Sequence, residues 1–153
     1  MHGKLIWRFS IADVTSDGPF SKFEGLARIL TVIDGAGLKL STPQGALFAL
    51  PLEPLAFSGD LPVSSARLNG NVQDFNVIYD PAVISAEVSM ERGIADLEAD
   101  SGFLVHTALL TGDSKVQGQP VAARSFILLE DGAARVESTA PMLCVTLRTI
   151  RVT

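Results

Sequence analysis

The segment VQDFNVIY, residues 72–79, decides the fold class, because its residues alternate with the two-residue period of a β-strand. Phe75 and Tyr79 then share one face of the strand, and Asp74 and Asn76 share the other. A polar pair on one strand face usually lies on the solvent side of a sheet. Inside a closed barrel, the same pair would line a pocket, and both interpretations are open from the sequence.

Strand-forming segments of this kind occur along the whole chain. Short runs of branched and aromatic residues are each bounded by Gly, Pro or Asp, which are typical turn residues. In the first half, the predicted strands cover residues 5–12, 28–34, 38–41, 46–50, 63–68 and 72–79. We expect a hairpin turn at DGAG, residues 34–37, and the helical candidate is residues 89–99, where Gly93 weakens the prediction. Roughly a dozen short strands separated by turns predict an all-β sandwich or barrel.

The composition predicts a folded, acidic protein. The chain has 153 residues, of which 47% are hydrophobic and 19% are charged, and its formal net charge is −5. This length suits one domain or two small fused halves with a real core. The acidic balance argues against nucleic-acid binding, because counterion release requires a stripe of Lys and Arg. No apolar run reaches the roughly 20 residues of a membrane span, so we expect no membrane association.

The single cysteine and the N-terminal residues predict a cytoplasmic protein. Cys144 cannot form an intrachain disulfide, which fits a reducing compartment. Residues 1–8 lack the apolar stretch of a signal peptide. Cys144 also lies in an apolar run, which predicts a buried and inert thiol.

Motifs for catalysis or for cofactor binding are missing from the sequence. The two histidines, His2 and His106, do not form the cluster that a metal site needs. His106 lies in the run LVHTALL and is expected to be a strand histidine with a satisfied hydrogen bond. No P-loop, GxGxxG, GxSxG or CxxC motif is present. We therefore expect no metal and no cofactor, and the sequence names no reaction.

Polar residues on predicted strands are the candidate ligand-binding residues. Arg8 and Ser10 alternate with apolar neighbours on the first predicted strand. Asp74 and Asn76 form a second polar pair of this kind on the strand predicted at residues 72–79. Arg28 and Arg67 add planar guanidinium groups, which suit a carboxylate. A small anionic ligand is the resulting hypothesis. Its candidate binding residues are Arg8, Ser10, Arg28, Arg67, Asp74 and Asn76.

The segment DGPFSKFEGLAR, residues 17–28, is too apolar for a solvated linker and too irregular for a helix or a strand. We expect Phe20 and Phe23 to pin this loop across an open barrel end, and Gly25 to let the chain approach the barrel. The loop would be either a lid over a pocket or a plug that only closes the barrel. The predicted pocket wall is Trp7, Phe20, Phe23 and Phe75, of which Trp7 and Phe75 lie one strand face away from the polar residues.

Three motifs occur in a fixed order: WRFSIADVTSDGPFSKFEG at residues 7–25, FSGD at residues 57–60, and ARLNGNVQDFNV at residues 66–77. In these motifs the chain resembles the HutD/Ves family, and the resemblance extends from residue 7 to about residue 78. The histidine-rich strand motif of metal-binding cupins is missing. The resemblance therefore gives no reason to expect metal-dependent chemistry.

The resemblance implies a cupin fold of the RmlC-like jelly-roll type. In that fold, residues 1–153 would form one compact bicupin domain with two β-barrel halves, approximately residues 1–82 and 83–153. The resemblance also implies an association with bacterial histidine utilisation. There the family is thought to act without established enzymatic activity, by binding N-formylglutamate and limiting flux or operon induction.

Three hypotheses for the function follow. The leading one is a non-enzymatic protein that binds a small carboxylate and regulates histidine catabolism. The second is a metal-independent cupin enzyme acting on a small acid or a sugar, with Asp74 or Tyr79 as the base. The third is a pure protein-interaction module that associates through sheet edges, for example as a homodimer.

Overall fold

The computed structural model describes residues 6–100 and 104–150, and every regular element in these ranges is a β-strand. The chain divides into two compact units, with the boundary between Ala82 and Val83. The strands of the first unit are β1 (Trp7–Val14), β2 (Gly18–Pro19), β3 (Ala27–Asp34), β4 (Leu38–Thr42), β5 (Gly45–Ala49), β6 (Leu55–Ser58), β7 (Ser64–Arg67) and β8 (Val72–Tyr79). The strands of the second unit are β9 (Ile84–Ala99), β10 (Leu104–Leu110), β11 (Ser114–Val116), β12 (Gln119–Val121), β13 (Phe126–Leu129) and β14 (Gly132–Thr149).

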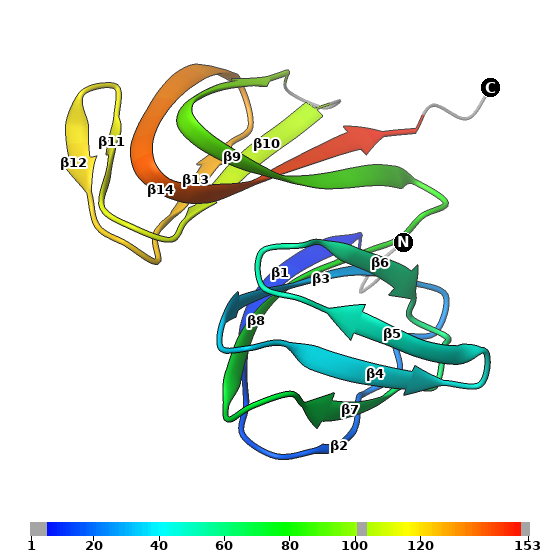
Figure 1. The fold of residues 1–153 in the computed structure, drawn as a ribbon. Helices are drawn as coiled ribbons and strands as arrows, with labels where there is room; N and C mark the ends of the chain where they lie inside the picture. Colours follow the sequence, from blue (N-terminus) through cyan, green and yellow to red (C-terminus); the bar gives the residue numbers. More distant parts are fainter. Residues whose placement is uncertain (1–5, 101–103, 151–153) are drawn as a thin grey trace. The chain divides into compact units, whose positions relative to one another are not determined.

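The first unit consists of two four-stranded antiparallel sheets (Figure 1). One sheet has the order β1-β8-β3-β6, and the other has the order β2-β7-β4-β5. Strand β8 is therefore hydrogen-bonded on both sides, so that Asn76 lies opposite Ser10 of β1 and opposite Leu30 of β3. Residues directly opposite one another in an antiparallel pair point to the same sheet face.

The turn at residues 34–37 is present, but the hairpin predicted there is wrong. The turn joins β3 to β4, and these strands belong to different sheets of the first unit. Gly35 and Gly37 have backbone φ angles of 98° and 120°, which residues with a Cβ atom rarely adopt. The glycine signal was correct for a turn, but it does not distinguish a hairpin from a crossover between sheets.

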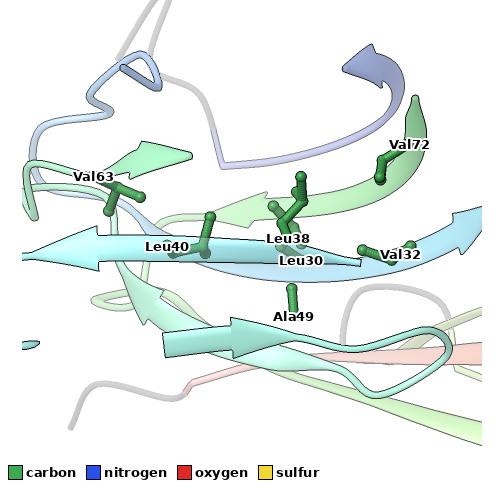
Figure 2. Close-up of a cluster of buried hydrophobic side chains, with 7 residues drawn as sticks. All are labelled: Leu30, Val32, Leu38, Leu40, Ala49, Val63 and Val72. Carbon is green, nitrogen blue, oxygen red and sulfur yellow. The ribbon is translucent and has the colours of Figure 1, made fainter. Parts of the chain in front are cut away.

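The apolar core of the first unit lies between its two sheets. Figure 2 shows the side chains of Leu30 and Val32 from β3 gathered with those of Leu38 and Leu40 from β4. The full set of buried residues in this cluster is Leu30, Val32, Leu38, Leu40, Ala49, Val63 and Val72. Because Leu30 and Val32 are core residues, the face of β3 and β8 that they share points into the unit.

The second unit is a six-stranded sheet with the order β12-β11-β14-β10-β13, in which β9 also pairs with β14. Strands β9 and β14 are 16 and 18 residues long, and both curve strongly along their length (Figure 1). The core of this unit is apolar, and its buried residues are Ala95, Leu97, Ala108, Leu110, Val136, Met142 and Cys144.

The helix expected at residues 89–99 is wrong, because these residues belong to β9. Ala95 and Leu97 are buried two residues apart, which is the period of a strand. Gly93 has a φ angle of 84° and lies beside the register shift between Ser138 and Met142 of β14. The glycine that weakened the helical pattern therefore marks a bulge in the strand ladder.

The all-β class predicted from the sequence is confirmed. The predicted segments 28–34, 38–41 and 72–79 coincide closely with β3, β4 and β8. In the part of the chain that the structure describes, no helix is long and apolar enough to cross a membrane.

Candidate functional site

Three of the six candidate residues meet inside the first unit, in a hydrogen-bonded chain. The guanidinium of Arg28 donates from Nη2 to Oδ1 of Asn76 at 2.9 Å. Nδ2 of Asn76 in turn donates to Oδ1 of Asp74, also at 2.9 Å. Only 7% of Arg28, 5% of Asn76 and 2% of Asp74 is exposed to solvent. We refer to these three residues as the Arg28 cluster.

The strand register explains why these side chains point inward. Asn76 and Asp74 lie opposite Leu30 and Val32, which are core residues of the same unit. Asp74 and Asn76 therefore occupy the inner face of β8, and the solvent-facing interpretation of this polar pair is wrong. Arg28 follows the same alternation two residues before Leu30, which places its guanidinium beside Asn76.

Three phenylalanine rings surround the guanidinium of Arg28. Its Cζ atom lies 5.4 Å from the ring centre of Phe20, 5.1 Å from that of Phe23 and 5.1 Å from that of Phe57. These distances are typical of cation–π contacts, which stabilise a cation that has lost water. Phe20 and Phe23 were predicted as wall residues, whereas Phe57 was missed. Its place in the FSGD motif was the available signal, and its pairing opposite Arg28 shows its role.

The loop that carries Phe20 and Phe23 is attached to residues 58–63. The backbone N–H of Phe20 donates to the carbonyl of Val63 at 2.8 Å, and that of Phe23 donates to Gly59 at 2.8 Å. The Gly25 N–H donates to Oδ1 of Asp60 at 3.0 Å. These bonds fix the two rings over Arg28.

Gly25 was expected to let the chain approach the barrel closely, but in the structure Gly59 has that role. Gly25 has a φ angle of 75°, and a Cβ there would meet no neighbour, so its role is the turn and not a close approach. The close approach occurs at Gly59, where a Cβ would collide with the backbone carbonyl oxygens of Phe23 and Leu26. The FSGD motif thus needs glycine so that the loop can pack against it.

Burial dominates the electrostatics of the Arg28 cluster. Burial lowers the pKa of Arg28; the Asp74 carboxylate opposes this shift and the Arg8 charge adds to it. Burial also raises the pKa of Asp74 to about 6, although the Asn76 hydrogen bond and the Arg28 charge act to lower it and Asp13 to raise it. Nε of Arg28 is buried and has no hydrogen-bond partner among the described residues. The cluster therefore contains a cation with an unused donor.

Arg8 and Ser10 lie beside the cluster on β1, which is an edge strand. Ser10 pairs opposite Asn76 and is half-buried, so it shares the inner face with the cluster. Arg8 is exposed, and its Cζ lies 5.4 Å from the ring centre of Phe23. The two arginines, Arg8 and Arg28, thus contact the same ring, one from the exposed strand edge and one from the interior.

The sixth candidate, Arg67, is not brought to the cluster. Its Nε donates to Oδ1 of Asp17 at 3.1 Å, and its Nη1 donates to Oδ1 of Asn71 at 2.7 Å. The backbone N–H of Arg67 also donates to Asp17, at 2.9 Å. Its hydrogen bonds therefore hold together the ends of two loops in the first unit.

Trp7 and Phe75 lie on the other face of their sheet. They alternate with Arg8 and Asp74 along β1 and β8, and their rings are joined through Phe9, with centroid separations of 4.9 Å and 5.9 Å. The structure therefore separates these two predicted wall residues from the Arg28 cluster. Tyr79 shares their face, so it does not join Asp74.

The described residues provide no group of three or more His, Cys, Asp or Glu side chains arranged to hold a metal ion. His106 lies on β10, and its Nδ1 is 3.3 Å from the backbone nitrogen of Glu98, which fits the expected strand histidine. Burial raises the pKa of the Cys144 thiol to about 11, so the thiol stays protonated as an inert core residue.

Known proteins are similar to this chain in sequence or in fold. The HutD family model matches residues 3–148. An uncharacterized 21.2 kDa protein in the hutC 3′ region of Pseudomonas putida is 41% identical over 100 residues, which are 65% of this chain and 53% of that protein. The chain therefore spans about half the length of this curated relative.

Two solved structures show the same architecture. HutD from Pseudomonas fluorescens SBW25, in its formate condition, is 29% identical, with a TM-score of 0.79 over 95% of this chain and 80% of that chain. A cupin 2 conserved barrel domain protein from Leptotrichia buccalis is 10% identical, with a TM-score of 0.60 over 97% of this chain and 86% of that chain. Together with the antiparallel sheets described above, these matches define a cupin-like β protein.

Within that class, the sequence identifies the family. The chain belongs to the HutD family, because the family model matches nearly its whole length. The family is associated with histidine utilisation. The resemblance inferred from the three ordered motifs is thereby confirmed.

Proposed function

We propose that this protein binds a small carboxylate without turning it over, and that it acts as a regulator in histidine utilisation. The observation that supports this proposal is the buried guanidinium of Arg28, whose Nε has no partner among the described residues. An arginine that has lost water retains strong donors for an anion. A ligand carboxylate would supply the hydrogen bond that Nε lacks.

Each neighbour of Arg28 has a separate role in this proposal. Asn76 holds the guanidinium in one orientation through its Oδ1, and its Nδ2 has a second hydrogen that could donate to a formyl or amide oxygen. Phe20, Phe23 and Phe57 exclude water from the cation, which strengthens its interaction with an anion. N-formylglutamate, which has carboxylates and a formyl group, is the ligand that we propose.

Isothermal titration calorimetry with N-formylglutamate, urocanate and glutamate tests the proposal. We expect N-formylglutamate to bind and Arg28→Gln to weaken it by about 10- to 100-fold, the value of a charge-assisted hydrogen bond. Arg67→Gln is the matched control, because Arg67 pairs with Asp17 outside the cluster. Absence of heat with all three compounds at millimolar concentration would overturn the proposal.

A second candidate function is a metal-independent enzyme that uses Asp74 as a general base. It is favoured by one observation, the burial that raises the pKa of Asp74 to about 6, close to the pH at which a base operates. Proton NMR of N-formylglutamate or urocanate mixed with the protein would reveal turnover. If a new product appeared with the wild type but not with Asp74→Asn, the non-enzymatic proposal would be replaced by this one.

We also propose that the two compact units are the two halves of a bicupin. The division after residue 82 and the likeness to a cupin barrel protein support this proposal. Separate expression of residues 1–82 and 83–153 provides the test. Two halves that form a stable complex when mixed would agree with it, and an experimental structure with a single closed barrel would overturn it.

A further inference from the structure

We propose that the anion enters the Arg28 cluster together with one proton, which Asp74 accepts from the solvent. This inference rests on the proposed carboxylate binding at Arg28 and names how that binding is regulated by pH. The ligand remains ionised on the guanidinium. The O–H bond of the Asp74 carboxyl group forms as an O–H or N–H bond of a hydronium ion or buffer acid in the solvent breaks, and no bond of the ligand is broken.

The count of buried charges leads to this inference. Without a ligand, the cluster has one cation, Arg28, and one carboxylate, Asp74, linked through the amide of Asn76 by two hydrogen bonds of 2.9 Å. A bound carboxylate would make two buried anions share one cation. Because both protein charges are at least nine-tenths buried, the repulsion is weakly screened. Protonation of Asp74 restores a neutral balance.

Other charged groups near the cluster do not provide the same compensation. On β1, the Arg8 charge lowers the pKa of Arg28, and the Asp13 charge raises the pKa of Asp74. Both side chains are exposed, and their charges have opposite signs. On either side of Phe23 in the loop, Lys22 and Glu24 are also exposed and of opposite sign. Solvent screens exposed charges of this kind. Asp74 is therefore the group that can adjust its charge inside the site.

The hydrogen-bond geometry allows Asp74 to hold the proton. Asn76 donates to Oδ1 of Asp74, so the other carboxyl oxygen can carry the hydrogen without loss of that bond. Burial already raises the pKa of Asp74 to about 6, so near neutral pH the carboxylate is mostly ionised before the ligand binds. A second anion beside it raises this pKa further, and the proton must be taken up on binding.

Calorimetry in buffers of different ionisation enthalpy measures this proton directly. Titrations of N-formylglutamate and of formate at about pH 7.5, in phosphate and in Tris, should each show uptake of about one proton per ligand. The affinity should fall by up to about tenfold from pH 6.5 to pH 7.5, because the complex holds one more proton. Asp74→Asn should remove both effects, whereas Asp96→Asn, which removes an exposed carboxylate of the second unit, should retain them.

The possible results separate this inference from the proposed function. Binding with equal heats in both buffers and an affinity independent of pH would overturn the proton uptake and leave carboxylate binding intact. No binding of either probe at any pH would overturn both. If Asp74→Asn did not fold, the comparison of buffers with the wild-type protein would still decide the question.

Discussion

The interiors of the two units show two ways of filling a curved β structure. In the first unit, the inner face of β3 and β8 carries the Arg28 cluster beside the leucine and valine core. In the second unit, the core contains apolar side chains, including Met142, together with the inert thiol of Cys144. The interior of the first unit therefore contains buried polar and charged side chains beside its apolar core, whereas the core cluster of the second unit is apolar.

Arg28 of the first unit and Arg135 of the second unit also differ in their burial and in their partners. Arg135 of the second unit is exposed, and its Nε donates to Oδ1 of Asp96 at 2.8 Å in an ordinary surface ion pair. Arg28 of the first unit is buried, and its guanidinium donates to Asn76, which in turn donates to the carboxylate of Asp74. A surface pair contributes little to stability, whereas a buried cation persists only where polar and aromatic groups replace water. This difference is the basis of the proposal that Arg28 binds an anion.

The largest predicted effect comes from placing a charge in the interior that lacks partners. Cys144→Asp should destabilise the protein by about 4 kcal/mol or more at pH 7, because the new carboxylate would be buried and would be repelled by Glu91. Urea unfolding at pH 7 and at pH 4.5 measures the effect, which should shrink at the lower pH as the carboxylate takes up a proton. Cys144→Ser is the uncharged control, and equal stability of both variants at pH 7 would contradict the contrast between the two interiors.

The next largest effect concerns the carboxylate that the first unit does bury. Because the folded-state pKa of Asp74 is raised to about 6, the stability that this group contributes is present at low pH and is lost as the pH rises from about 4 to 6. The advantage of Asp74→Asn over the wild type should therefore grow by about 3 kcal/mol across this window. Denaturant unfolding at several pH values measures it.

Asp96 of the second unit is the control, because its pKa is shifted in the opposite direction from that of Asp74. The Arg135 hydrogen bond lowers the pKa of Asp96, so the stability contributed by this group is lost as the pH falls. Asp96→Asn should thus show no growing advantage as the pH rises from 4 to 6. If Asp74→Asn behaved in the same way as Asp96→Asn, Asp74 would not be buried in the manner described.

Gly59→Ala tests how the loop over the Arg28 cluster is held. A Cβ at this position would collide with backbone carbonyl groups of the loop, at a predicted cost of about 2 kcal/mol. Limited proteolysis and amide hydrogen exchange should show faster opening of residues 20–26. Unchanged protection of these residues would mean that the contact with Gly59 does not hold the loop.

The smallest predicted effect tests whether the loop of residues 17–28 is a lid over a binding site or a plug that only closes the barrel. Phe20→Ala removes a half-buried ring and one cation–π contact with Arg28, and should cost about 1–2 kcal/mol of stability. A lid would also lose affinity for N-formylglutamate, as calorimetry would show. If stability fell while the affinity stayed the same, the loop would be a plug. Phe48→Ala, which removes a mostly exposed ring of β5, is the matched control.

Local signals predicted the strands and the two faces of β8, but not which face lies inside. Alternation in residues 72–79 assigns Asp74 and Asn76 to one face, whereas the second sheet of the unit makes that face the interior. The partner of Arg67 could not be predicted for a similar reason, because Asp17 is 50 residues away in the chain. Phe57 was missed because only its pairing with β3 places it beside Arg28.

The sequence by itself determined the all-β class, the strand periods, the turn positions and the family, because these depend on neighbouring residues and on ordered motifs. The tertiary structure alone decided that Arg28, Asn76 and Asp74 form one buried chain, and that Arg67 lies apart from it. The physical reason is that burial and charge pairing depend on contacts between strands far apart in the chain, and local periodicity does not specify these contacts.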